Sequence, residues 1–290
     1  MAAKAWFYFF SFSALATAVV WLGVFTAPAD NLQIIACDVG QGDAILLQEG
    51  ATQILVDGGP NNDVIRCLGR YMPFWDRRLE AVVMTHADAD HATGLIEVFR
   101  RYEVNSFIAN EFKHGTQVFS LLLDEVQKEE VEVINPMAGM SMLIGLMHLD
   151  IVWPLPEHDR FAANVLAAQD PPTSPNDLSA VFVLRYGDFD ALLTGDIGPK
   201  TANKLAISGA IGDVEYLKVP HHGSKNGLTL DLLDKAMPEV AVISAGRRNR
   251  FGHPHGEIIK MLENGKVRIL RTDEAGDVVV ASDGNRLWVE

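Results

Sequence analysis

Strand-sized apolar segments alternate with helix-like segments through most of the chain after Asp30, and this alternation limits the possible folds more than any other feature. The apolar segments are β-branched or leucine-rich and end at Gly, Asp or His, which is typical of buried strands. Between them, apolar residues three or four positions apart predict helices. Strands mixed with helices predict a layered α/β domain over residues 30–290. The predicted strands are 32–37, 44–48, 53–57, 79–85, 179–186, 190–195, 214–219 and 240–246, and the predicted helices are 62–71, 94–102, 118–128, 200–208, 228–236 and 257–264.

The N-terminal segment predicts export. Residues 5–27 carry no charge and are long enough to cross a bilayer as a helix. Lys4 precedes this run, so the positive-inside bias places the N-terminus in the cytoplasm and the remainder outside. Ala27 and Ala29 also fit a signal-peptidase site, although signal h-regions are usually shorter. We therefore expect residues 1–29 to be either a signal anchor or a cleaved signal peptide. An anchor would hold the domain outside the cytoplasm as a single-pass membrane protein, and cleavage would release it as a secreted protein.

Composition excludes some functions. The chain has 24 Lys and Arg against 38 Asp and Glu, a formal net charge of −14, so a nucleic-acid role requires a local cationic site. Cys37 and Cys67 are too few for a disulfide scaffold or a thiolate metal cage, and we expect both to be small core residues. Residues 155–177 predict a long loop, a type of segment that often has a function in compact domains.

The densest polar cluster follows the predicted strand at 79–85. Its sequence THADADH at 85–91 places four potential metal ligands within six residues, at the end of an apolar strand that can hold them rigidly. Asp196 ends another apolar strand, and His221 and His222 follow a third. Histidine and carboxylate side chains at three strand ends predict a metal site.

This constellation resembles the metallo-β-lactamase superfamily, whose members carry H-x-H-x-D-H followed by a His, an Asp and a last His. Within that superfamily, residues 31–290 resemble the hydrolase domain of ComEC-type DNA-internalisation competence proteins. The matching blocks are DVGQGDA at 38–44, VDGGP at 56–60, THADADH at 85–91, NDLS at 176–179, LTGDI at 193–197, KVPHHGS at 218–224, NRFGHP at 249–254 and RTD at 271–273. The resemblance implies an αββα sandwich with two divalent metal ions at its edge.

The resemblance also implies roles for individual residues. Asp196 would bridge the two ions, and Asp57 and Asp43 would support the ligands from behind. One of His221 and His222 would complete the metal site, and the sequence leaves open which one. The implied metal ligands are His86, Asp88, Asp90, His91, Asp196, and His221 or His222.

Two departures from the superfamily pattern bear on the metal. The second His of H-x-H-x-D-H is Asp88 here, and Asn176 stands where the middle His is expected. Oxygen donors shift metal preference from zinc towards manganese or magnesium. We therefore expect manganese, with zinc as the alternative.

The mechanism implied is attack of a metal-activated water on a phosphodiester. Asp90 would orient the attacking hydroxide, and His253 would bind a phosphate oxygen or protonate the leaving group. Arg250, in the sequence RRNR at 247–250, and Lys225 would bind substrate phosphates together with Asn176.

Three functions follow. The first is a metal-dependent phosphodiesterase or nuclease acting on DNA strands outside the membrane. No long apolar run recurs after Asp30, so we expect any DNA channel to be a separate membrane protein. The second is a phosphodiesterase acting on cell-wall or phosphocholine-type esters, which suits the acidic charge. The third is an inert metal-binding adaptor of an uptake assembly.

Overall fold

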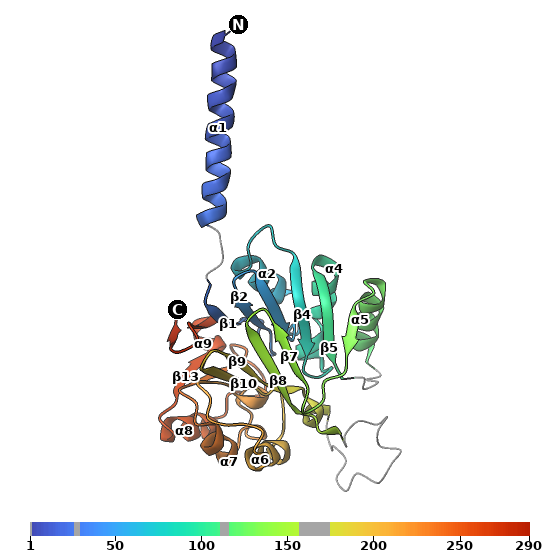
Figure 1. Ribbon diagram of the computed structural model, residues 1–290. Helices are drawn as coiled ribbons and strands as arrows, with labels where there is room; N and C mark the ends of the chain where they lie inside the picture. The colour runs from blue at the N-terminus through green and yellow to red at the C-terminus, as the bar shows by residue number, and fades with distance from the viewer. Residues whose placement is uncertain (1, 26–29, 111–115, 157–174) are drawn as a thin grey trace.

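Two β-sheets pack face to face between two layers of helices in the computed structural model, which describes residues 2–25, 30–110, 116–156 and 175–290 (Figure 1). This is the predicted αββα sandwich. The first sheet has the order β15-β14-β1-β2-β3-β4-β5-β6, and the second has the order β13-β12-β11-β10-β9-β8-β7.

The strands of the first sheet are β1 (Leu32–Ala36), β2 (Ile45–Glu49), β3 (Thr52–Val56), β4 (Arg78–Met84), β5 (Glu103–Ala109), β6 (Glu132–Ile134), β14 (Val278–Ser282) and β15 (Leu287–Val289). Those of the second sheet are β7 (Ser141–Ile144), β8 (Met147–Trp153), β9 (Val181–Tyr186), β10 (Phe189–Leu193), β11 (Tyr216–Lys218), β12 (Val240–Ile243) and β13 (Arg268–Arg271). The helices are α1 (Ala2–Phe25), α2 (Asp63–Tyr71), α3 (Ala89–Ala92), α4 (Leu95–Arg101), α5 (Gln117–Lys128), η3 (Pro175–Leu178), α6 (Pro199–Ser208), η4 (Pro220–Gly223), α7 (Leu230–Ala236), α8 (Gly256–Asn264) and α9 (Thr272–Ala275).

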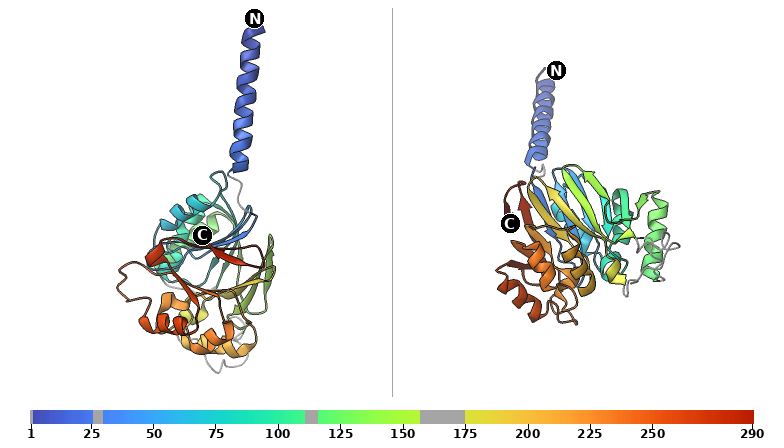
Figure 2. Two further views of the ribbon diagram at one scale, coloured as in Figure 1. Left: turned by 90° about the vertical axis from the view of Figure 1, so that its left-hand side faces the viewer. Right: turned by 60° about the horizontal axis from the view of Figure 1, so that its bottom comes forward.

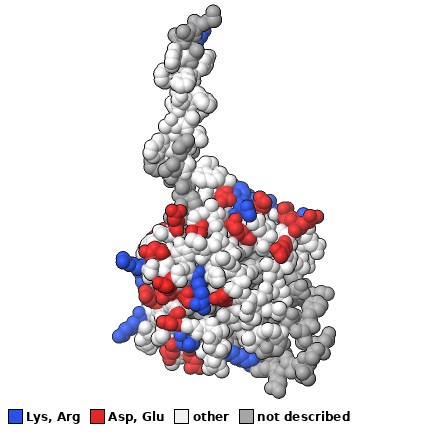
Figure 3. Space-filling model, in the orientation of Figure 1, with Lys and Arg blue, Asp and Glu red and all other residues white. Residues whose placement is uncertain are grey.

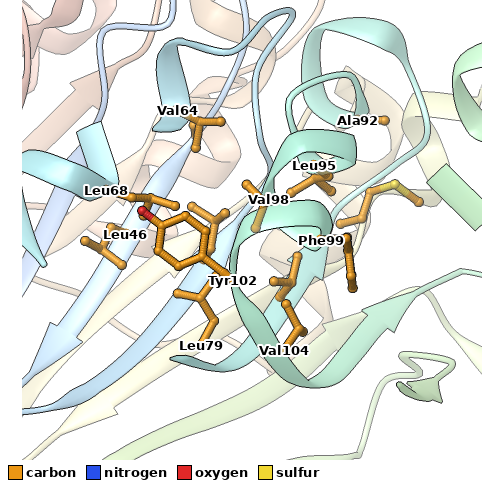
Figure 4. Packing of buried hydrophobic residues seen from close by; sticks show 14 of the residues in the cluster. Leu46, Val64, Leu68, Leu79, Ala92, Leu95, Val98, Phe99, Tyr102 and Val104 are labelled. Atoms are coloured by element: carbon orange, nitrogen blue, oxygen red, sulfur yellow. The ribbon is translucent and has the colours of Figure 1, made fainter. Parts of the chain in front are cut away.

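Side chains that alternate along each strand produce three core layers. Leu46 of β2 packs outward against α2 and α4, whereas its neighbour Leu47 packs inward against the second sheet. Figure 4 shows Leu68 of α2 and Val98 of α4 within the outer layer. On the other side, α6, α7 and α8 cover the second sheet through a separate apolar layer.

Parallel strands determine where loops converge. Strands β3 to β6 are mutually parallel, and so are β10 to β13. In open α/β sheets, ligands bind beyond the carboxyl ends of parallel strands. Leu32, the first residue of β1, pairs with Glu49, which in turn pairs with Thr52, the first residue of β3. The chain therefore enters the sandwich from α1 at the amino ends of the parallel strands, opposite to the carboxyl ends. Both views of Figure 2 show α1 pointing away from α6, α7 and α8.

The N-terminal helix α1 exposes large apolar side chains, among them Trp6 and Phe7. Over the ranges that the structure describes, no helix combines the length and apolar character needed to traverse a bilayer. The predicted single-pass anchor is therefore not confirmed.

The prediction for the cysteines was incomplete. Cys37 and Cys67 are buried core residues, as expected, but they also form a disulfide, with 5.9 Å between their Cα atoms. Helix α2 packs against the end of β1 and brings them together, which their separation of 30 residues did not reveal. Most of the predicted loop at 155–177 lies outside the described residues, and its end forms η3.

Candidate metal centre

The predicted ligands come from loops at the carboxyl ends of strands in both sheets. Residues 85–91 follow β4, Asp196 follows β10, and His221 and His222 follow β11 in η4. Both η4 histidines have left-handed backbone conformations, with φ values of 52° and 54°. Such conformations are unfavourable for residues with a Cβ, by about 1–2 kcal/mol each. Strain of this kind is typically found where a functional site requires it.

Four of the predicted ligands form one compact group. Asp90, His91, Asp196 and His222 each offer one ligand atom, and these atoms all lie within 4.8 Å of one another. His91 Nε2 and His222 Nε2 lie 3.4 and 3.3 Å from the same oxygen, Asp196 Oδ2. His222 Nε2 is also 3.5 Å from Asp90 Oδ2. We refer to these four side chains as the inner cluster.

Several buried nitrogen and oxygen atoms of the inner cluster have no hydrogen-bond partner, as expected of atoms that bind a cation. His91 Nε2, His222 Nε2 and Asp196 Oδ1 are buried and make no hydrogen bond, and neither does His86 Nε2 nearby. An unpartnered buried polar atom is costly and requires an explanation. Imidazole nitrogens and carboxylate oxygens are also the donors that bind divalent transition metals. The residues present therefore fit a divalent ion.

A sparser group lies beside the inner cluster. His86 Nε2 is 3.6 Å from Asp88 Oδ2, and the rings of His86 and His91 are 4.1 Å apart. His221 Nε2 lies 3.9 Å from Asp196 Oδ2 and is partly exposed. Asp196 thus lies within reach of both groups, as expected of a bridging ligand. Of the two adjacent histidines, His222 belongs to the inner cluster.

Asp57 holds the strand-end loop from behind. Its carboxylate accepts hydrogen bonds from the Thr85 N–H at 2.8 Å, the Thr85 hydroxyl at 2.7 Å and His91 Nδ1 at 2.8 Å. Since Thr85 Oγ1 donates to Asp57, it accepts from His86 Nδ1, which is 3.1 Å away. These contacts place a proton on Nδ1 of both histidines and leave the Nε2 lone pairs facing the site.

Asp43 supports the other side of the site. It lies 3.4 Å from His222 Nδ1 and 2.7 Å from Lys218 Nζ. His222 Nδ1 also donates to the Ser244 carbonyl oxygen at 3.0 Å, so its Nε2 likewise faces the site. Lys218 is 1% exposed. Its ion pair with Asp43 therefore holds Lys218 in the interior.

At Asp196, His91 and His222, attraction between opposite charges together outweighs the effect of burial on the pKa. Burial alone would raise the pKa of Asp196, but His222 and His91 lower it well below its usual value. Burial would lower the pKa values of His91 and His222, but nearby carboxylates raise both well above the usual range: Asp196 and Asp57 act on His91, and Asp196 and Asp43 act on His222. Protons therefore occupy these sites without metal and compete with it.

The outer side of the site is formed by the loop after β12. His253 Nδ1 is 3.4 Å from Gln41 Nε2, which can only donate, so the His253 ring carries its own proton on Nε2. Burial, followed by the nearby His222 and His221, lowers the pKa of His253 to about 4. His253 is consequently neutral at pH 7.

The predicted substrate-binding residues are less tightly defined. Arg250 lies with its guanidinium carbon 5.0 Å from the Phe251 ring centroid. Lys225 is exposed, and its backbone N–H donates to His255 Nδ1. Asn176 lies in η3. Substrate contacts by all three stay predictions.

Sequence reasoning did not assign a role to Ser179. Its hydroxyl lies 3.5 Å from His86 Nδ1 and accepts the Asp196 N–H at 3.2 Å, so it connects the two strand ends. The available signal was its position at the end of the NDLS block at 176–179, just before β9. Thr85 was likewise quoted in a motif without a role.

Comparison with known proteins agrees with this architecture. A family model described as "Metallo-beta-lactamase superfamily" matches residues 37–247. The ComE operon protein 3 of Bacillus subtilis (strain 168) is 25% identical over 282 residues, covering 90% of this chain and 34% of that protein. Competence protein ComA of Neisseria gonorrhoeae is 23% identical over 257 residues, covering 86% and 32%. The chain thus spans about a third of the length of these curated relatives. The resemblance inferred from the motifs is confirmed.

A solved structure shares the fold. The metallo-β-lactamase fold protein YhfI from Bacillus subtilis superposes with a TM-score of 0.57 at 12% identity, covering 87% of this chain and 100% of that chain. Similarity at this level of identity concerns the arrangement of sheets and helices, and it agrees with the αββα sandwich.

Proposed function

Because the chain belongs to the metallo-β-lactamase superfamily of metal-dependent hydrolases, we propose that it hydrolyses phosphodiester bonds in DNA strands with two divalent metal ions. The observation that carries this proposal is the inner cluster, whose buried His91 Nε2, His222 Nε2 and Asp196 Oδ1 face one another without hydrogen-bond partners. The alternatives are hydrolysis of cell-wall or phosphocholine-type esters and a metal-binding adaptor without catalysis.

The side chains define how the ions would be held. The inner cluster would bind one ion, and His86 and Asp88 would bind the other, with Asp196 shared between them. Bound divalent ions supply a water of lowered pKa and neutralise phosphate charge. The carboxylates among the donors favour manganese, with zinc as the alternative.

Two further residues act on water and substrate. Asp90 would orient the attacking water, and its exposure supports this role, since it is the most exposed member of the inner cluster, with 36% of its side chain accessible. His253, neutral at pH 7, donates its Nε2 proton in a hydrogen bond to a phosphate oxygen. Its lowered pKa favours this role over protonation of the leaving group.

Substrate contacts form the next part of the proposal. Arg250 and Lys225 supply positive charge near His253 in an otherwise acidic chain, and Asn176 supplies an amide. DNA as the substrate is suggested by the resemblance of residues 31–290 to the hydrolase domain of DNA-internalisation competence proteins, which agrees with the similarity to a protein named "Competence protein ComA".

We propose that the domain works outside the cytoplasm, at the membrane and beside a separate channel protein. The buried disulfide between Cys37 and Cys67 supports this location, because disulfides persist mainly in oxidising compartments. Protease accessibility of the domain in intact and permeabilised cells tests the location; protection in intact cells that is lost on lysis would contradict it.

The function is tested with three substrates. Purified full-length protein is incubated with end-labelled single-stranded DNA, bis-p-nitrophenyl phosphate or p-nitrophenyl phosphocholine, each with Mn²⁺ or Zn²⁺. DNA cleavage that is lost in Asp196→Asn supports the proposal. Turnover of p-nitrophenyl phosphocholine without DNA cleavage favours the ester hydrolase, and metal binding without any turnover favours the adaptor.

A further inference from the structure

A row of aromatic rings leads from the inner cluster to the surface. The ring centroids of His91 and His222 are 5.3 Å apart, those of His222 and His253 are 6.3 Å apart, and those of His253 and Phe251 are 5.7 Å apart. The interplanar angles along this row are 34°, 30° and 24°, so the two outer pairs are stacked and the innermost pair is tilted. The two inner rings are fully buried, His253 is half-buried, and Phe251 is 50% exposed.

The loop that carries Phe251 is held in place by one side chain. Asn249 Nδ2 donates to the carbonyl oxygens of Gly246 at 2.9 Å and His253 at 2.6 Å. Asn249 Oδ1 accepts the backbone N–H groups of Phe251 at 3.1 Å and His253 at 3.0 Å. The amide thus ties Phe251 and His253 to the end of β12, and Phe251 is presented by an ordered backbone.

Burying a Phe side chain contributes about 1.5–3 kcal/mol, so an ordered Phe that stays half exposed forgoes part of that gain. Single exposed apolar residues need no special explanation. Phe251 differs because it is stacked against His253, a residue proposed to contact substrate. Its position beside the reacting centre is therefore informative about the substrate.

One cationic side chain lies against this ring, and two others are close to it in the sequence. Arg247, Arg248 and Arg250 are exposed, and the Arg250 guanidinium lies against the Phe251 ring. On the face drawn in Figure 3, Lys and Arg side chains lie interspersed with Asp and Glu. An aromatic ring beside an arginine is a combination with which proteins bind single-stranded nucleic acids, because bases stack on the ring and on the guanidinium plane and phosphates attract the cation.

The same chemistry argues against a choline ester. Quaternary ammonium groups are bound by aromatic rings through cation–π attraction. The positive charge of Arg250, whose guanidinium carbon lies 5.0 Å from the Phe251 ring centroid, would repel such a cation.

We propose that Phe251 and Arg250 form a stacking platform for a nucleobase next to the scissile phosphodiester of a single-stranded substrate. This inference rests on the proposed function and specifies its substrate class. Two ring steps of 6.3 and 5.7 Å separate Phe251 from His222, so the stacked base belongs to a nucleotide close to the metal centre. Phe251 is a specificity-determining residue in this scheme.

The test combines a change in the protein with a change in the substrate. Full-length wild type, Phe251→Ala and Phe251→Trp are assayed with Mn²⁺ on a single-stranded oligonucleotide and on versions with one abasic nucleotide at successive positions. We expect Phe251→Ala to lower kcat/KM for the intact strand about 10- to 100-fold. One abasic position should lower wild-type activity similarly and have little further effect on Phe251→Ala. Phe251→Trp should restore most of the activity.

A second readout does not depend on catalysis. The metal-free proteins are mixed with a set of oligonucleotides, each of which carries a single 2-aminopurine at a different position. Stacking on Phe251 should quench the fluorescence at one position in wild type and not in Phe251→Ala. The matched control is Phe74→Ala, another exposed aromatic residue, in the segment between α2 and β4. It should change neither cleavage nor quenching.

The outcomes separate the platform from the proposed function. DNA cleavage with the same intact-to-abasic ratio in wild type and Phe251→Ala would overturn the platform and leave the nuclease proposal standing. Position-specific quenching that depends on Phe251, without DNA cleavage by wild type, would support the platform while the nuclease proposal fails. Absence of both effects would overturn both.

Discussion

Replacing Asp57 with Asn tests how the chain prepares His91 for metal. Asn tolerates the left-handed conformation at this position, where φ is 59°, and preserves the size of the side chain. Its carbonyl oxygen can still accept the Thr85 N–H. Its NH₂ group, however, must face His91 Nδ1, to which it donates. The ring proton of His91 then moves to Nε2, the atom that faces the inner cluster.

The size of the effect follows from the hydrogen bond that is lost. The bond from His91 Nδ1 to the Asp57 carboxylate is 2.8 Å long and completely buried. A hydrogen bond to a charged group contributes about 1.5–3 kcal/mol, which corresponds to about a 10- to 150-fold change in an equilibrium constant. We therefore expect Mn²⁺ affinity to fall by about this factor, comparable to the 10- to 100-fold typical of groups that orient metal ligands.

The assay is titration of EDTA-stripped protein with Mn²⁺ against a chromophoric competitor chelator. The matched control is Asp177→Asn, since Asp177 is also a buried aspartate that accepts hydrogen bonds, from the Gly198 N–H at 3.3 Å and the Thr201 hydroxyl at 3.1 Å. It lies outside the metal-binding group and should leave affinity unchanged. An Asp57→Asn protein that is folded and binds Mn²⁺ within twofold of wild type would refute the reasoning.

Three other predictions concern stability. Lys218→Met removes one partner of a buried ion pair and leaves Asp43 uncompensated, so the free energy of unfolding in urea should fall by about 3–5 kcal/mol; a loss under 1 kcal/mol would contradict the pairing. Replacing Cys37 and Cys67 with Ala opens a loop of 30 residues, and chain entropy predicts that the free energy of unfolding falls by about 3.6 kcal/mol. Urea unfolding measures this loss, and unchanged stability would contradict it. The third prediction concerns pH. The raised pKa of His91 contributes stability that is complete below about pH 6.5 and is lost as the pH rises through the folded-state pKa, so EDTA-treated protein should melt at lower temperature at pH 9 than at pH 6.5. Mn²⁺ should remove most of this difference, and a melting temperature that rises with pH in EDTA would count against it.

Much of the fold was predictable from short-range patterns. The predicted helix at 62–71 corresponds to α2 (Asp63–Tyr71), and the predicted strand at 240–246 begins with β12 (Val240–Ile243). Several strands were missed, for different reasons. β7 has the exposed or partly buried side chains of an edge strand. β14 is fully buried, but it depends on pairing with β1, more than 240 residues away in the chain.

The location of the site was predictable because its residues directly follow apolar strands. The choice between His221 and His222 was not, since it depends on backbone conformations that no local pattern encodes. The burial of Lys218 was equally hidden, because only the folded chain brings Asp43 to it. Local sequence thus indicates which segments form the site, whereas long-range packing determines which atoms in it come into contact.

In the proposed mechanism, loops from both sheets together bind a pair of divalent ions. A crystal structure of the protein grown with Mn²⁺, with data collected for anomalous scattering at the manganese edge, tests it most directly. We predict one peak among Asp90, His91, Asp196 and His222 and a second beside His86 and Asp88. A fully ordered site without anomalous density, or manganese bound only elsewhere on the molecule, would show that these loops do not bind the ions.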